Sequence, residues 1–292
     1  MAQKENSFFE RLTPLRKNCG FRQDNYFVWC GSAIQGEDGQ YHLFASRWPV
    51  GTGFPDGYRT SSEIVRAVSD TPEGPYVFQE VVISGRGGDY WDAQMAHNPT
   101  ILKVGDTYVL YYLGAKSADY RTRTIGYAYS KSLEGPWTRV DQNITLKPDS
   151  NNPAAVLKPD GTILLYFRYG DMKLGVAAAK TFDSEYTVLN EDIMPGKKLE
   201  DPFVFYYNDR FEMLVEDNGG MVTGHERYGA HLVSEDGITD WKPNVPAIAY
   251  DHLLKWEDGT ATLANRRERP QLLLDDNNNP SHLFTAVKIG EK

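Results

Sequence analysis

The chain has 292 residues, of which 40% are hydrophobic and 13% aromatic, and its formal net charge is -9 at pH 7. This acidity disfavours nucleic acids and anionic membranes as partners, because both bind basic surfaces. The two cysteines, Cys19 and Cys30, are too few for a disulfide framework or the usual zinc site. No run of about 18 apolar residues predicts a membrane span. Residues 1–11 are polar rather than signal-like, which favours a cytoplasmic protein, or a periplasmic or secreted one if a signal peptide was removed.

The first predicted elements form a β-hairpin. Two stretches rich in aromatic and apolar residues, 26–34 and 41–45, flank a turn at Glu37-Asp38-Gly39. A loop rich in glycine and proline follows over residues 48–60, long enough to be functional rather than merely connecting. A third strand is expected over 64–69, and the turn 71–75 leads from it into residues 76–78.

This order of elements returns from residues 98, 152 and 201. Each unit has a short strand, a turn, two more strands and then an aromatic residue. The aromatic lies seven residues beyond the third strand in all four units, from Ser69 to Tyr76, Ser130 to Trp137, Ala179 to Tyr186, and Ser234 to Trp241. Four short antiparallel strands, repeated about every 50–60 residues, are typical of a β-propeller blade.

We therefore predict an all-β fold, a single five-bladed β-propeller over residues 1–292. The blades are expected near residues 26–80, 96–140, 151–190, 200–243 and 250–292. The last unit is incomplete, because only residues 271–274 and 282–287 have a strand pattern. Since exposed sheet edges are a liability, we expect residues between about 8 and 27 to supply the missing strand and close the ring.

In a propeller the first strand of each blade lines the central axis, so the residues that open these strands converge on one funnel. Most of these openings are a polar residue followed by proline. They are Gly31, His97-Asn98, Asn152, Glu200-Asp201 and Glu268-Arg269, with Asp92 just upstream of the second. Carboxyl groups that gather in this way are costly unless they are paired or used in chemistry.

The motifs Glu200-Asp201-Pro202 and Glu268-Arg269-Pro270, with the turns Gly74-Pro75-Tyr76 and Gly135-Pro136-Trp137, resemble those of the five-bladed propeller glycoside hydrolases of families 43 and 117. The resemblance covers residues 26–287. It implies an exo-acting glycosidase on a plant or algal oligosaccharide, with Asp201 as the tuning carboxylate and Glu268 as the general acid. It also implies inversion at the anomeric centre and no required cofactor, although a divalent ion in the central channel would fit the family.

The resemblance does not identify the general base, because this chain has Asn98-Pro99 where the family has Asp-Pro. Asp92 is the first candidate, Asp24 the second and Glu216 the third. Glycoside hydrolysis needs one carboxylic acid for the leaving oxygen and one carboxylate for water or the anomeric carbon.

Further residues are expected to bind the sugar. They are Trp91, His97, Asn98, Asn152, Arg168, Glu216, His231 and Arg269. Two other kinds of function remain open from the sequence, a sugar-binding propeller without catalysis and a scaffold that binds protein on its rim. A lectin would use the same aromatic residues without converging acids, and a scaffold would need neither.

Overall fold

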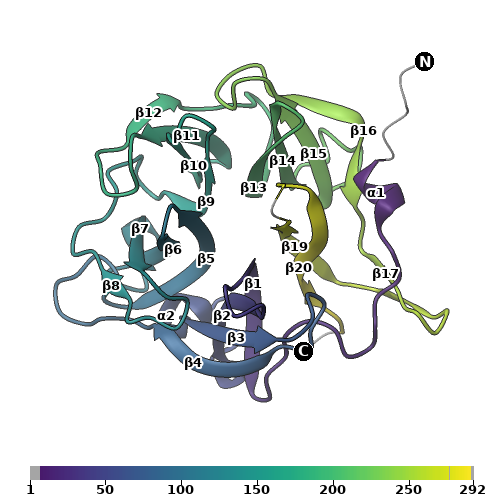
Figure 1. Cartoon of the computed structure of the whole chain (residues 1–292), viewed down its shortest axis with the longest axis horizontal. Helices are drawn as coiled ribbons and strands as arrows, with labels where there is room; N and C mark the ends of the chain where they lie inside the picture. Colours follow the sequence, from purple (N-terminus) through teal and green to yellow (C-terminus); the bar gives the residue numbers. More distant parts are fainter. Residues whose placement is uncertain (1–6, 276, 291–292) are drawn as a thin grey trace.

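A computed structural model describes residues 7–275 and 277–290 of the chain. It is built from antiparallel β-sheets arranged around a centre, as a β-propeller is (Figure 1). The described helices are short, α1 (Phe8–Arg11), α2 (Tyr58–Ser61) and the 3-10 turns η1 (Val50–Thr52) and η2 (Tyr120–Thr122). No helix among these described residues is long and apolar enough to cross a membrane.

Four sheets have four strands each, in sequence order. The first has β1 (Tyr26–Gln35), β2 (Tyr41–Pro49), β3 (Glu63–Ser69) and β4 (Val77–Ile83). The second has β5 (Met95–Val104), β6 (Thr107–Ala115), β7 (Arg123–Ser130) and β8 (Thr138–Arg139). The third has β9 (Asn151–Leu157), β10 (Ile163–Tyr169), β11 (Lys173–Ala179) and β12 (Thr187–Asn190). The fourth has β13 (Leu199–Tyr207), β14 (Arg210–Asp217), β15 (Tyr228–Ser234) and β16 (Lys242–Tyr250).

The remaining strands form two smaller sheets. A hairpin of β17 (Leu253–Lys255) and β18 (Ala261–Leu263) precedes the pair β19 (Arg266–Leu274) and β20 (Pro280–Lys288). The strands nearest the centre are β1, β5, β9, β13 and β19, in that order around it (Figure 1). The all-β propeller arrangement predicted from the sequence is therefore confirmed.

Burial along the strands follows from this arrangement. All nine residues of β6 are buried, because neighbouring sheets cover both of its faces. The outer strand β4 instead alternates between exposed and half-buried residues up to its last residue, the buried Ile83, since one of its faces meets water.

The repeated aromatic residues each reach a neighbouring sheet. Trp137 packs edge-on against Phe44, the Tyr186 hydroxyl lies 2.8 Å from the Tyr111 hydroxyl, and Trp241 packs against Tyr166. Tyr76 does the same with Phe284 of β20. The seven-residue register therefore places a ring at the boundary between two sheets in every repeat.

The N-terminal residues do not add the expected strand to β20. Residues 8–11 form α1, and Leu15 makes only an isolated parallel bridge with Trp256. The segment is anchored through Phe8, which is 7% exposed and packs in a cluster that includes Phe205 and Leu272. In the described residues, the N-terminus therefore binds the side of the fourth and last sheets instead of extending a sheet.

This anchoring gives the first testable prediction. Replacing Phe8 by alanine removes a buried ring, so we expect the free energy of unfolding to fall by about 3 kcal/mol. The matched control is Phe9→Ala, because Phe9 is 38% exposed and its loss should change stability little. Chemical denaturation of both variants provides the measurement, and equal effects would contradict the anchoring role.

Candidate functional site

The five inner strands share one irregularity in their N-terminal halves. Their pairing registers shift there, and one non-glycine residue in each adopts a left-handed backbone. These residues have φ between 51° and 58°, and they are Cys30, Asn98, Asn152, Asp201 and Arg269. Proline follows four of them and Gly31 the fifth. Proline lacks the N–H that a strand ladder needs, so it suits a bulge at which pairing is interrupted.

The side chains of these bulge residues join one another around the centre, and we call them the axial ring. Asn98 accepts from the Cys30 thiol at 2.7 Å and donates to Asn152 Oδ1 at 2.7 Å. Asn152 donates to Asp201 Oδ1 at 2.5 Å, and Arg269 reaches the same oxygen at 3.1 Å. Left-handed conformations of non-glycine residues cost free energy and persist where surrounding contacts hold them, often at functional sites.

A cavity lies next to the axial ring. The residue before each bulge lines, together with the bulge residue, a cavity of about 230 Å³. These wall residues are Trp29, His97, Asn151, Glu200 and Glu268. The loop between β2 and β3 adds Phe54 and Tyr58 to the lining, and Arg123, Arg227 and Arg266 add charge.

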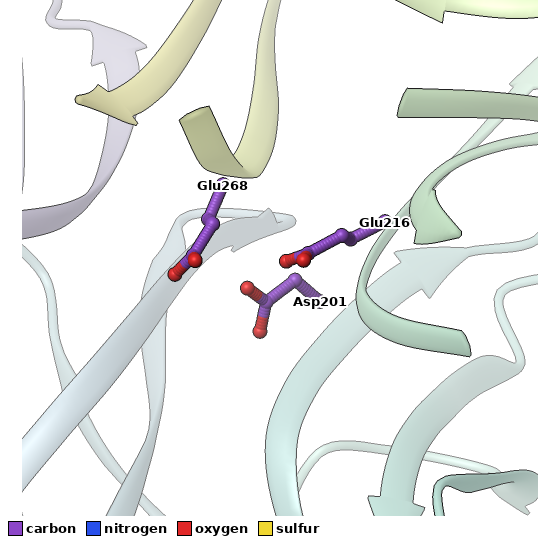
Figure 2. Close-up of side chains that lie close together, drawn as sticks. All are labelled: Asp201, Glu216 and Glu268. Atoms are coloured by element: carbon purple, nitrogen blue, oxygen red, sulfur yellow. The ribbon is translucent and has the colours of Figure 1, made fainter. Parts of the chain in front are cut away.

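Three buried carboxyl groups meet beside this cavity. Oxygen atoms of Asp201, Glu216 and Glu268 lie within 4.8 Å of one another, and Figure 2 shows the three carboxyl groups pointing toward a common point. Burial raises the pKa of Asp201 to about 7 and also raises that of Glu268. The pKa of Glu216 is raised well above its usual range, first by burial and then by Glu268 and Asp201.

Arginine side chains partly neutralise this cluster. Arg227 lies 3.2 Å from Glu216 Oε1 and 3.3 Å from Glu268 Oε1, and Arg266 lies 3.3 Å from the same Glu268 oxygen. Within the described part of the chain, the other oxygen of Glu268, Oε2, makes no hydrogen bond. A proton on Oε2 is therefore free to reach a ligand in the cavity.

The three carboxyl groups have the donor chemistry of a divalent-cation site, but their surroundings do not fit one. Glu268 Oε1 is shared by two guanidinium groups, and Asp201 Oδ1 by Arg269 and Asn152. A cation there would have to displace these positive groups, so we derive no step through a metal.

Burial of these acids gives a prediction about pH. Their pKa values are higher in the folded protein than in the unfolded chain, so the folded state binds more protons above about pH 4. Stability should therefore fall as pH rises from about 4 through 7, by up to about 1.4 kcal/mol per pH unit for each carboxyl that titrates. Denaturation curves across this range should show a shallower fall for Glu216→Gln, and no change of slope for the exposed Glu226→Gln. Parallel slopes in wild type and Glu216→Gln would contradict the buried cluster.

The structure brings together part of the site that the sequence predicted. Asp201, Glu268, His97, Asn98, Asn152 and Arg269 line the cavity. Glu216 lies in the acid cluster, and Arg168 lies 3.6 Å from Glu200.

Asp92 lies elsewhere, which corrects its expected position in the funnel. Its side chain is fully buried, and Arg86 donates to Oδ1 at 2.9 Å. Arg139 and Tyr112 donate to Oδ2 at 2.5 and 2.6 Å. A general base must reach water, and these partners occupy both oxygens of Asp92. The second candidate, Asp24, lies exposed in a turn and does not line the cavity.

Trp91 and His231 are also outside the site. Trp91 packs on Tyr112, and its ring fills the space that a Cβ at Gly126 would occupy. His231 lies 2.9 Å from Glu212 and packs against Phe8. Both residues pack within the sheets and do not line the cavity, so their expected position at the sugar site is corrected.

Some cavity residues were missed by the sequence reasoning. Cys30 joins the axial ring, yet its strand lacks the proline that marks the other four. Counting back from the hairpin turn at Glu37-Asp38-Gly39 would have aligned Cys30 with the other bulge residues. The cavity arginines Arg227 and Arg266 lie outside the repeated motif, and no sequence signal separates them from surface charge.

Comparisons with known proteins locate this architecture. No protein-family model and no curated protein matches the sequence. Solved structures do match. One is a family 117 glycoside hydrolase of the marine bacterium Zobellia galactanivorans, with 16% identity, a TM-score of 0.60, and coverage of 79% of this chain and 73% of that one. The fold is that of the β-propeller glycoside hydrolases.

Two further structures support this likeness. A family 43 enzyme of Xanthomonas citri, solved with xylotriose, has 16% identity and a TM-score of 0.62 over 87% of this chain and 80% of its own. A family 43 β-xylosidase/α-arabinofuranosidase from a compost metagenome, solved with xylotriose in a calcium-free form, has 13% identity and a TM-score of 0.63 over 95% and 94%. At these identities the likeness shows the fold alone.

Proposed function

We propose that this protein hydrolyses glycosidic bonds at the end of a plant or algal oligosaccharide. The observation that carries the proposal is the acid cluster beside the cavity, in which burial raises the pKa of Glu268 and holds a proton near a ligand. Glycoside hydrolysis needs such a protonated acid for the leaving oxygen. Glu268 is assigned as that acid.

Asp201 is assigned as the carboxylate that tunes the acid. It is anchored in the axial ring, and oxygen atoms of the two side chains lie within 4.8 Å. A neighbouring negative charge favours the protonated form of a carboxylic acid. Loss of Asp201 would therefore make Glu268 a poorer proton donor at neutral pH.

Exo-action is supported by the size of the cavity. About 230 Å³ is below the usual range of about 300–1,000 Å³ for ligand pockets, and suits the end unit of a chain more than its middle. Aromatic rings of Trp29, Phe54 and Tyr58 in the lining give flat apolar faces on which a sugar can stack.

The fold assignment extends in the same way. We infer that β19 and β20 act as the fifth blade and close the ring against the first sheet. Phe284 of β20 packs against Tyr76 at 6.1 Å, and Arg269 of β19 completes the set of axial residues.

A screen of purified protein against chromogenic glycosides and plant and red-algal oligosaccharides tests the proposed function. Release of a single sugar from chain ends is the expected result, with the anomer of the first product followed by NMR. A lectin is the second candidate, because Asn98 stands where the family has its base. Saturable oligosaccharide binding by calorimetry without any product would establish the lectin and exclude hydrolysis.

A further inference from the structure

Two of the five wall residues carry carboxyl groups, and another carboxyl group, that of Asp56 in the loop between β2 and β3, also lines the cavity. Of the five wall residues, Glu200 and Glu268 come from the adjacent inner strands β13 and β19. The others are Trp29, His97 and Asn151, from β1, β5 and β9. In the order around the centre, β5 is not a neighbour of β19, so other inner strands separate the strand of His97 from that of Glu268 (Figure 1).

Neighbouring side chains fix the orientation of His97, and one of its two ring nitrogens has no hydrogen-bond partner among the described residues. Its Nδ1 lies 2.8 Å from Ser62 Oγ, and its ring stacks on Tyr58 with 4.6 Å between centroids. Trp48 packs edge-on from another side at 5.6 Å. Nothing among the described residues hydrogen-bonds to Nε2, although the residue is only 5% exposed and lines the cavity. The free nitrogen is therefore available to whatever the cavity holds.

The surroundings keep this imidazole neutral. Burial lowers the pKa of His97 well below its usual value, and the nearby Arg269 and Arg123 lower it further. When Nδ1 carries the hydrogen and donates it to Ser62, Nε2 bears a lone pair. Asn98 replaces the expected acid, and its side-chain oxygen and nitrogen are both hydrogen-bonded within the axial ring.

We propose that His97 is the general base of this site and takes the role that a carboxylate would have at position 98. The inference rests on the proposed hydrolase function. A water oxygen attacks the anomeric carbon while its proton passes to His97 Nε2. The bond from that carbon to the leaving oxygen breaks, and this oxygen takes the electron pair and the proton of Glu268. Solvent then removes a proton from His97 and returns one to Glu268.

The step leaves the total charge of the cavity unchanged, because imidazolium forms as Glu268 becomes negative. Arg269 and Arg123 disfavour the imidazolium, so it is a transient species that returns its proton to solvent. Inversion needs the attacking water on the face of the sugar opposite the acid, and a base on a strand that is not a neighbour of β19 suits that arrangement.

The test compares His97→Gln with Glu200→Gln and with the exposed control His225→Gln, after equal unfolding midpoints establish that all are folded. His97→Gln should lower kcat by about 10²–10⁴-fold on activated and unactivated glycosides alike, because attack by water needs a base whatever the leaving group. Ser62→Ala should cause a smaller loss, since it frees the tautomer without removing the ring.

Sodium azide separates a catalytic from a structural role. As a nucleophile that needs no base, it should restore turnover of an aryl glycoside by His97→Gln and yield a glycosyl azide of inverted configuration. Retained turnover in His97→Gln, or azide rescue of Glu200→Gln in its place, would overturn the assignment and leave the hydrolase function standing. A wild-type protein that cleaves no substrate would overturn both proposals.

Discussion

Glu268→Gln should lower turnover of glycosides with poor leaving groups by about 10²–10⁴-fold, the usual contribution of a general acid. Glutamine preserves the shape of the side chain and can still accept from Arg227 and Arg266, but it has no proton to give to an alkoxide. Aryl glycosides with activated leaving groups need little protonation, so their turnover should fall much less. Steady-state kinetics on a matched pair of aryl and alkyl glycosides gives the measurement.

The control for this experiment is Glu257→Gln, which makes the same chemical change in an exposed ion pair with Arg16. It should leave both substrates unaffected. If the turnover of both substrates falls equally in Glu268→Gln, proton donation is not the role of Glu268, and the residue acts in positioning or in folding.

Asp92→Asn should be the most destabilising of the conservative changes considered, by about 3 kcal/mol in the free energy of unfolding. Asp92 is the shared acceptor of Arg86 and Arg139 in a fully buried position, and removal of one partner leaves buried charge without compensation. Turnover per folded molecule should stay near that of the wild type, because Asp92 does not line the cavity. Urea denaturation and active-site kinetics at low temperature measure the two effects separately.

Asp141→Asn is the matched control. Asp141 pairs with the same Arg86 at 2.7 Å, but its side chain is 67% exposed, so its loss should cost no more than about 1 kcal/mol. A collapse of turnover in Asp92→Asn without any loss of stability would restore its role as the base.

The fold was accessible from sequence because the repeat is written in local terms. Turns, strand lengths and one aromatic residue recur at the same spacing in every unit, and each unit forms one sheet. The two last strands were predicted as well, but the contact of β20 with the first sheet was not, because it joins Phe284 and Tyr76, more than 200 residues apart in sequence. No local pattern predicted that α1 would pack at the side of the ring.

The site divides along the same line. Asp201 and Glu268 were found because they belong to the repeated opening of the inner strands. Asp92 is near Asn98 in sequence but not in space, because the chain turns its side chain toward Arg86 and Arg139. Charge partners of this kind come from other strands, and their pairing follows from packing that a single sequence does not display.

The axial ring also has a direction. Asp201 Oδ1 accepts from the amide nitrogen of Asn152, so Asn152 presents its oxygen to Asn98. Asn98 is set in the same sense and leaves its own oxygen for the Cys30 thiol. The side chains at these similar backbone positions thus form a chain of hydrogen bonds that all point the same way, from the Cys30 thiol to the carboxyl group of Asp201. A chemical change at the Cys30 thiol would therefore alter the hydrogen bonding of Asp201, because the two asparagine amides between them cannot reorient independently.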